Sequence, residues 1–163
     1  MRTFDDSRGA KFAVVTLLPA SSADREAFLH MAGQHFRELN PNFIATEDWN
    51  RHYFDRILEN PKLSLCWAMT ANTRAGFILF GIEDHIFMPQ QNGVVYELYV
   101  MPEFRRQGIA RACAQLAIDQ MQSSQPSKIH LEIMQDNCNA AEFWATLGFA
   151  KVAERWVLRR TRT

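Results

Sequence analysis

Apolar and polar positions along the chain change rhythm several times, and each change marks a predicted element. β-branched, aromatic and other apolar residues dominate six short segments that we predict to be strands: 11–18, 63–70, 75–83, 93–101, 128–134 and 149–158. The second and third segments flank the turn signal Ala71-Asn72-Thr73-Arg74, which predicts an antiparallel hairpin. Apolar residues at helical spacing, such as Ile109, Ala112 and Leu116, predict helices between the other segments.

Start and stop signals give approximate ends to these helices. The serine pair 21–22 offers an N-cap for a first helix through about Leu39, with Glu26 placed for a capping box. A second helix starts after Thr46 and stops before Pro61. A third begins at about 107–108, and a fourth, over 140–147, ends at a glycine.

The order of the segments indicates the fold class. Antiparallel strands come first and a helix–strand–helix–strand run follows, which is typical of an α/β or α+β domain. We expect a central, mixed, mostly antiparallel sheet flanked by helices. It would occupy one domain over residues 11–161, after a polar N-terminal segment of residues 1–10.

Composition narrows the function classes. The 163 residues are 47% apolar and 22% charged, which excludes a disordered or low-complexity chain. Eighteen basic residues balance eighteen acidic ones, so we expect no nucleic-acid partner. A small arginine cluster near the C-terminus (Arg155, Arg159, Arg160 and Arg162) is interpreted as a solvated strand end.

Cysteine spacing and hydropathy suggest a cellular setting. Cys66, Cys113 and Cys138 form no CxxC pair, and the five histidines share no metal-ligand spacing, so we expect no metal. The polar start of the chain and the lack of an apolar run of roughly 20 residues predict neither a secretory signal nor a membrane span. We therefore expect a cytoplasmic protein that does not bind membranes.

The segment 96–111, YELYVMPEFRRQGIAR, contains the most informative chemistry. A strand leads into a short loop and then a helix start, where unpaired amides and the helix dipole favour anions. Gly108 permits close approach of a pyrophosphate, Ala110 keeps the helix start small, and three arginines add positive charge. Neither the GxGxxG pattern nor the GxxxxGK pattern occurs. By itself the segment predicts only a generic anion site.

Two motifs carry a resemblance to a known family. Residues 105–110, RRQGIA, fit (Gln/Arg)-x-x-Gly-x-(Gly/Ala), and residues 137–149 resemble NxxAxxFYxxxGF. These motifs, in this order and at this separation, are similar to those of the GNAT superfamily of N-acetyltransferases. The first is closest to the polyamine and aminoglycoside branch. The resemblance is strong over about Gly93 to Glu154 and only topological before that.

The resemblance implies a binding site for acetyl-coenzyme A in a sheet splayed between the strand at 96–101 and the strand at 128–134. Backbone groups of Leu98, Tyr99 and Val100 would pair with the pantetheine, and one amide would polarise the thioester carbonyl. Asn137 would contact the pantetheine arm, with Phe143 and Trp144 beside it. The residues implied at the diphosphate are those of the first motif: Arg105, Arg106, Gln107, Gly108, Ile109, Ala110 and Arg111.

Glu97 is the first candidate for a catalytic base. It lies in an otherwise apolar strand, where burial would raise its pKa towards a useful range. It could instead pair with an arginine or bind a cationic substrate, and His130 could support it if the strands are neighbours. Trp144 stands where many relatives have a tyrosine acid, so Tyr99, Tyr96 or water is left for that role. Cys138 is interpreted as incidental.

The predicted function is acetyl transfer from acetyl-coenzyme A to a primary amine by direct attack in a ternary complex. The acceptor would be a small-molecule amine or a protein amine, and a homodimer is compatible with the family. A catalytically weak acyl-coenzyme A-binding module of the same fold is the alternative, and a phosphate-binding protein sharing only the turn is a third reading. Candidates for lining the acceptor site are acidic or aromatic, although core packing is the simpler interpretation of the aromatic ones: Phe36, Phe43, Trp49, Tyr53, Phe54, Glu83, Asp84 and Asp136.

Overall fold

The computed structural model describes residues 14–158, which fall into two compact units divided after Glu132. The first unit contains a five-stranded sheet whose strand order, β1-β2-β3-β4-β5, follows the order of the chain. Neighbouring strands β1 to β4 are antiparallel, and β5 is parallel to β4. The strands are β1 (Val15–Pro19), β2 (Leu63–Thr70), β3 (Thr73–Asp84), β4 (Gln91–Val100) and β5 (Ile129–Leu131).

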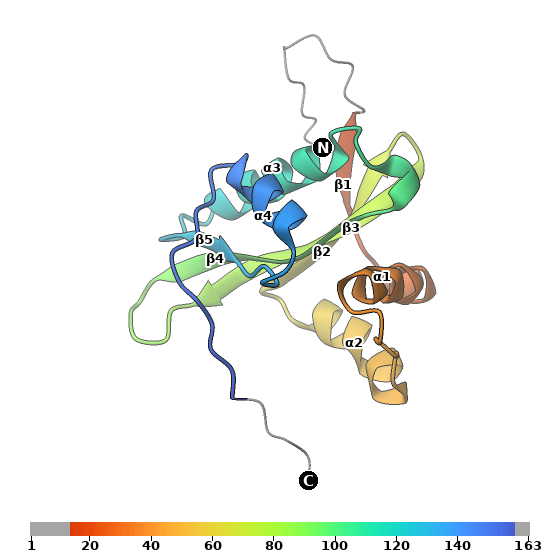
Figure 1. Ribbon diagram of the computed structural model, residues 1–163, viewed down its shortest axis with the longest axis horizontal. Coiled ribbons are helices and arrows are strands. Elements are labelled where there is room, and N and C mark those ends of the chain that lie inside the picture. Colours follow the sequence, from red (N-terminus) through yellow and green to blue (C-terminus); the bar gives the residue numbers. More distant parts are fainter. Residues whose placement is uncertain (1–13, 159–163) are drawn as a thin grey trace. The chain divides into compact units, whose positions relative to one another are not determined.

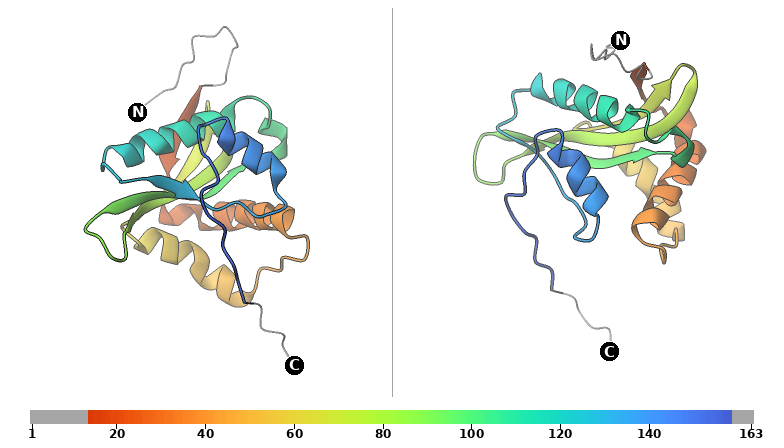
Figure 2. Two further views of the ribbon diagram at one scale, coloured as in Figure 1. Left: turned by 60° about the vertical axis from the view of Figure 1, so that its left-hand side comes forward. Right: turned by 45° about the horizontal axis from the view of Figure 1, so that its top comes forward.

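Helices cover both faces of this sheet (Figures 1 and 2). Helices α1 (Arg25–Leu39) and α2 (Glu47–Glu59) lie on one face, where Phe28, Trp67 and Tyr99 belong to one buried cluster. Helix α3 (Ile109–Gln122) lies on the other face, where Cys113 and Val100 belong to a second cluster. The predicted class, a mixed and mostly antiparallel sheet flanked by helices, is confirmed.

Local signals explain where the first two helices begin. The Thr46 side chain caps α2 by accepting a hydrogen bond from the Trp49 amide at 3.1 Å, as the sequence indicates. A short 3₁₀ turn, Ser22–Asp24, precedes α1 and carries the capping box. The partner of Ser21 in that box is Asp24 rather than the predicted Glu26, because the 3₁₀ turn places Asp24 three residues after the cap.

The second unit contains helix α4 (Cys138–Ala145). Gly148, three residues after the end of the helix, has a left-handed backbone with φ of 90°. The Trp144 ring packs on the Phe149 ring with centroids 5.3 Å apart. The predicted strand over 149–158 is wrong, because none of its residues joins a strand in the described structure and Trp156 is 90% exposed. β propensity alone does not make a strand without a neighbouring strand to complete the hydrogen bonds.

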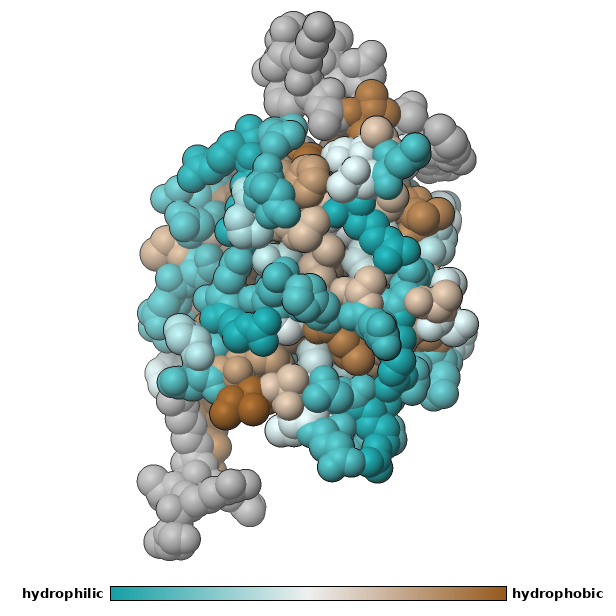
Figure 3. All heavy atoms as spheres, turned by 90° about the vertical axis from the view of Figure 1, so that its right-hand side faces the viewer, coloured by the Kyte–Doolittle hydropathy of each residue, from teal (hydrophilic) through white to brown (hydrophobic). Residues whose placement is uncertain are grey.

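Other predicted bounds change modestly. The strand expected at 128–134 is shorter, since only Ile129–Leu131 pairs with β4. The N-terminal segment of residues 1–10, the start of the strand expected at 11–18, and three of the four clustered arginines lie outside the described residues. Within the described residues, no helix has the length and apolar character needed to cross a membrane. Polar side chains cover most of the face in Figure 3, and apolar ones form small separate patches there.

Candidate active site

Strands β4 and β5 part after a short parallel pairing. The paired residues run from Gly93 with Ile129 to Val95 with Leu131. Beyond Val95, β4 stays paired with β3 as far as Val100, but no described strand pairs with its other edge. This unpaired stretch of β4, residues 96–100, includes Leu98, Tyr99 and Val100, whose backbone groups the sequence analysis assigned to pantetheine.

A β-bulge at Tyr96 begins the unpaired stretch. Leu79 of β3 lies opposite Glu97, and the next residue, Phe80, lies opposite Val95, so Tyr96 is the extra residue. The extra residue moves the side chains that follow it on β4 to the opposite face of the sheet from the one that simple alternation would give. A Cβ at Gly93 would contact Met121 of α3, whereas Tyr99 packs in the cluster beside α1 and α2. Because of this change, Glu97 and Tyr99 both face α1 and α2.

Glu97 contacts a histidine that the sequence analysis did not assign to the site. Its Oε2 lies 2.6 Å from Nε2 of His35 on helix α1. His35 is buried, and the Glu97 side chain is 21% exposed. The carboxylate is therefore held on one side and open to solvent on the other. The expected support from His130 is wrong, because His130 Nε2 lies 2.8 Å from Glu83 instead.

The pKa values of two tyrosines, Tyr53 and Tyr96, are raised by burial and in part by the charges of Glu97 and Glu83. Burial, and secondarily the charge of Glu97, raises the pKa of Tyr53 on α2. Burial, and secondarily the charge of Glu83, raises the pKa of Tyr96 in the bulge. Both phenols therefore stay protonated at neutral pH and can serve as hydrogen-bond donors beside the carboxylates.

Tyr99 belongs to a polar cluster next to the motif turn. Its hydroxyl lies 3.3 Å from Oε1 of Glu38, and burial above all raises its pKa. Arg105 donates from Nη2 to both oxygens of Glu38, and from Nε to the carbonyl of Val100 at 2.8 Å. The Arg105 side chain therefore braces helix α1 and the end of β4, and its donors at Nε and Nη2 are used within the protein.

The turn before α3 has the backbone of an anion site. Arg106 and Gly108 both have left-handed backbones, with φ of 63° and 78°. Gly108 is the N-cap of α3, and no described side chain caps the helix by a hydrogen bond. Arg106, Gln107 and Arg111 are exposed, while Ile109 is buried and anchors the helix start. Closely spaced left-handed residues ahead of an uncapped helix start match the requirements of a phosphate group.

The second motif lies in the second unit. The Asn137 side chain caps α4 by accepting a hydrogen bond from the Ala140 amide at 3.1 Å. The Phe143 and Trp144 rings lie edge to face with centroids 5.0 Å apart, and Trp144 is buried. The structure thus gives Asn137 a local role that the sequence analysis did not consider, alongside the predicted one.

The aromatic residues of α1 and α2 pack against one another. Trp49 and Tyr53 stack with centroids 5.2 Å apart, Phe36 lies against both, and Phe54 is buried in the adjoining core. Cys66 and Cys113 are buried and Cys138 is exposed, all three as free thiols. Among the described residues no group of three metal-ligating side chains comes together.

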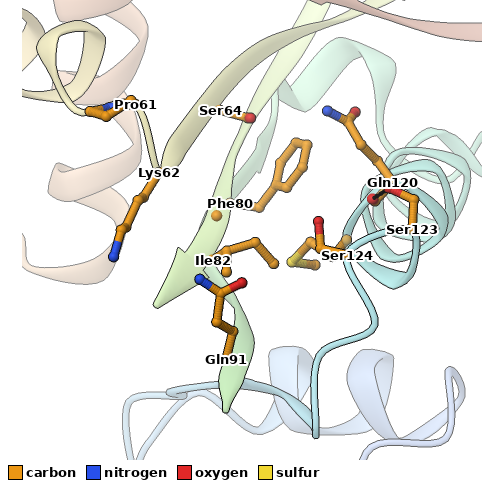
Figure 4. Close-up of a pocket in the computed structure, with 11 residues that line it drawn as sticks. Pro61, Lys62, Ser64, Phe80, Ile82, Gln91, Gln120, Ser123 and Ser124 are labelled. Atoms are coloured by element: carbon orange, nitrogen blue, oxygen red, sulfur yellow. Dashed lines mark hydrogen bonds between the residues drawn. The ribbon is translucent and has the colours of Figure 1, made fainter. Parts of the chain in front are cut away.

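One cavity lies elsewhere in the first unit. It measures about 320 Å³, and its lining includes Lys62, Phe80 of β3 and Gln120 in the last turn of α3. Figure 4 shows Phe80 and Gln120 on facing sides of it. The motif turn is at the opposite end of α3, roughly 20 Å away along a helix of 14 residues. The predicted cofactor residues do not line this cavity.

Comparison with known proteins identifies the family. Residues 30–149 match the acetyltransferase (GNAT) family. The chain belongs to the GNAT family of acetyltransferases. The match includes the part of helix α1 that carries His35, the split edge of β4, the motif turn and Asn137. The resemblance inferred from two motifs is therefore confirmed over most of the chain.

Individual relatives are distant. An uncharacterized N-acetyltransferase of Methanocaldococcus jannaschii is 22% identical over 150 residues, which cover 87% of this chain and 64% of the relative, a little under two thirds of its length. The structure of a ribosomal-protein-alanine N-acetyltransferase from Brucella melitensis aligns with a TM-score of 0.73 at 18% identity, covering 90% of this chain and 99% of that one. An aminoglycoside N-acetyltransferase in complex with coenzyme A aligns with a TM-score of 0.71 at 18% identity, covering 97% and 99%. At these identities the solved structures establish the fold.

Two residues of the site escaped sequence reasoning, His35 and Glu38. His35 follows Phe28 and Met31 at helical spacing on the buried face of α1, so a histidine at an apolar position was the available signal. No pattern in the sequence marked Glu38, because its partners lie more than sixty residues away in the chain.

Proposed function

We propose that the chain transfers an acetyl group from acetyl-coenzyme A to a primary amine by direct attack in a ternary complex. The observation that supports this most strongly is the unpaired edge of β4, which runs beside Glu97 and leads into the uncapped start of α3. An extended chain can add to such an edge, and a diphosphate suits such a helix start.

Acetyl-coenzyme A supplies the activated acetyl group, and the protein would hold it along two stretches of backbone. The amides of 106–111 would bind the diphosphate, with Arg106 and Arg111 adding charge. The backbone of Leu98, Tyr99 and Val100 would bind the pantetheine, and an amide there would polarise the thioester carbonyl. Asn137, Phe143 and Trp144 complete the proposed binding set.

Glu97 would act as the general base. A primary amine is largely protonated at neutral pH, so it must lose a proton before it can attack a carbonyl. The Glu97 carboxylate combines a fixed oxygen with an exposed side, which lets an ammonium reach it. The carboxylate would take the proton, and the amine would then be free to attack.

Trp144 stands where many relatives have a tyrosine that protonates the departing thiolate. In this chain the thiolate would either take its proton from another group or leave without one. Tyr99 stays protonated, but its hydroxyl lies beside Glu38. A thiol with a pKa near 8.5 can also leave as the thiolate. Tyr99 remains the candidate acid, with water as the alternative.

The acceptor would be a small-molecule amine or an amine on a protein. The similarity to an aminoglycoside N-acetyltransferase and to a ribosomal-protein-alanine N-acetyltransferase supports both classes. Release of free thiol from acetyl-coenzyme A should be followed with kanamycin, spermidine and a peptide that begins with alanine. A cytoplasmic location and a homodimer remain predictions.

The proposal is tested by Glu97→Gln. We expect calorimetry to show unchanged binding of acetyl-coenzyme A and turnover to fall by about 100-fold or more, with a smaller loss at high pH. Glu26→Gln, the same change on the exposed first turn of α1, is the control and should keep full turnover. Binding of acetyl-coenzyme A without turnover of any amine in the wild-type protein would favour the acyl-coenzyme A-binding module instead.

A further inference from the structure

His35 occupies an unusual place for an ionisable side chain. It is 8% exposed, and its ring lies among those of Phe36, Phe77 and Tyr99, with centroids 5.3 to 6.0 Å away. A buried imidazole in an aromatic setting needs a polar partner to offset the loss of water. The partner is Oε2 of Glu97, 2.6 Å from Nε2.

The contact joins two elements that the sequence keeps far apart. His35 comes from α1, and Glu97 comes from the β4 residue immediately after the bulge. The side chain of Glu97 has rotatable bonds that would otherwise let its carboxylate swing towards solvent. The aromatic rings around His35 fix the imidazole, and the imidazole fixes one oxygen of the carboxylate.

We propose that His35 is a positioning residue that holds one Glu97 oxygen at Nε2 and keeps the other available to the incoming ammonium. This inference rests on the proposed function, in which Glu97 is the base. In the step that His35 supports, an N–H bond of the ammonium breaks and its proton moves to the Glu97 carboxylate. The electron pair stays on nitrogen, and the proton later leaves through the exposed side of Glu97.

The other ionisable groups facing the pair do not replace His35. Burial and the charge of Glu97 raise the pKa of Tyr53 on α2, so Tyr53 stays a neutral phenol. Tyr99 of β4 stacks near the imidazole and directs its hydroxyl to Glu38. Arg105, whose guanidinium lies 5.5 Å from the centroid of the Tyr99 ring, is bound to Glu38 and the Val100 carbonyl. His35 is thus the side chain seen to contact the Glu97 carboxylate directly in the described part of the chain.

A double-mutant cycle tests this role. His35→Leu removes the donor at similar volume, His35→Gln retains an amide donor, and each is combined with Glu97→Gln. We expect His35→Leu to lower kcat about 10-fold or more with KM for acetyl-coenzyme A nearly unchanged, and His35→Gln to recover part of the loss. In the Glu97→Gln background, His35→Leu should cost less than about 2-fold more, because its effect passes through Glu97. His30→Leu, on the exposed side of the same helix, is the matched control.

Equal losses from His35→Leu with and without Glu97 would show a merely structural role and overturn the proposal. A second measurement requires neither turnover nor an identified amine. In NMR spectra, the imidazole resonances of His35 should change in Glu97→Gln and stay unchanged in Glu26→Gln, because only the first substitution alters the carboxylate at Nε2. Unchanged His35 resonances in Glu97→Gln would overturn the contact. Normal turnover of Glu97→Gln would overturn the base assignment, and no turnover in the wild-type protein would overturn the proposed function separately.

Discussion

Glu38 accepts two hydrogen bonds from Nη2 of Arg105, each 2.8 Å long, and thereby ties the end of helix α1 to the motif turn. Both side chains are more than 40% exposed, so Glu38→Gln should change the free energy of unfolding by less than about 1 kcal/mol. Arg105→Gln also loses the bond to the Val100 carbonyl. We therefore expect Arg105→Gln to weaken binding of acetyl-coenzyme A more than Glu38→Gln does, as measured by calorimetry. Equal weakening would contradict the bracing role.

Gly108 offers a test of the diphosphate site with a matched control. Gly108 and Gly148 both have left-handed backbones, so an alanine at either position should cost on the order of 1 kcal/mol of stability. Only Gly108→Ala should also lower the affinity for acetyl-coenzyme A, by about 10-fold or more, because a Cβ would stand where the proposed diphosphate site meets the helix start. Calorimetry on both variants decides the matter. An affinity loss of the same size in Gly148→Ala would count against the assignment.

Asn137 has a structural role and a proposed binding role that two substitutions can separate. Asn137→Ala removes the cap of α4 and should cost about 1 kcal/mol in urea unfolding. Asn137→Asp keeps an oxygen that can accept from the Ala140 amide but loses the amide donor. If Asn137 contacts the cofactor, Asn137→Asp should raise KM for acetyl-coenzyme A while leaving stability nearly unchanged. A normal KM for acetyl-coenzyme A in a stable Asn137→Asp variant would exclude the cofactor contact and leave Asn137 with its role as the cap of α4.

The close approach of β3 and β4 leaves no space for a side chain at Gly76, which lies opposite the end of β4. A Cβ at Gly76 would lie 2.0 Å from the carbonyl oxygen of Tyr99, which is a backbone atom and cannot move aside freely. Gly76→Ala should therefore destabilise the protein by about 1–3 kcal/mol and displace β4. Gly33→Ala in helix α1 meets only the flexible end of Arg37, at 3.5 Å, and should be neutral or stabilising. Urea unfolding of the two variants should move in opposite directions or differ clearly in size.

Asp24 should contribute to acid sensitivity. The hydrogen bond from the Ser21 amide, above all, holds the pKa of Asp24 below its ordinary value of 3.8, with Arg74 also contributing. A carboxyl with a lowered pKa in the folded state contributes stability above its unfolded pKa and loses it as pH falls through the folded pKa. The stability gap between the wild-type protein and Asp24→Asn should therefore be full at pH 6 and shrink below about pH 4 in urea unfolding. A gap that stays constant with pH would exclude this contribution.

Local signals in the sequence were sufficient for most elements but not for the details of the site. The Thr46 cap, the hairpin around Ala71 and the start of α3 follow from short-range chemistry, and the structure has them where they were predicted. The pairing of β5 and the fate of 149–158 depend on which strands become neighbours, which propensity does not encode.

The pattern of apolar and polar residues also could not predict the face of the sheet on which Glu97 lies. Simple alternation along β4 would put Glu97 on the same face as Gly93, which faces α3. The bulge at Tyr96 reverses this, and a bulge has no reliable mark in a single sequence. The partner of Glu97 therefore came from α1 rather than from β5.

The agreement between strand order and chain order has a consequence for how the protein reaches this structure. Strands β2, β3 and β4 pair in succession across short connections, so this part of the sheet can grow by two successive hairpins. Strand β1 joins β2 only across the long segment that contains α1 and α2. The parallel addition of β5 needs a crossover through α3 and should come last. During synthesis on the ribosome, β2 to β4 could thus pair before the motif turn has left the exit tunnel, and the split edge of β4 would be in place ahead of that turn.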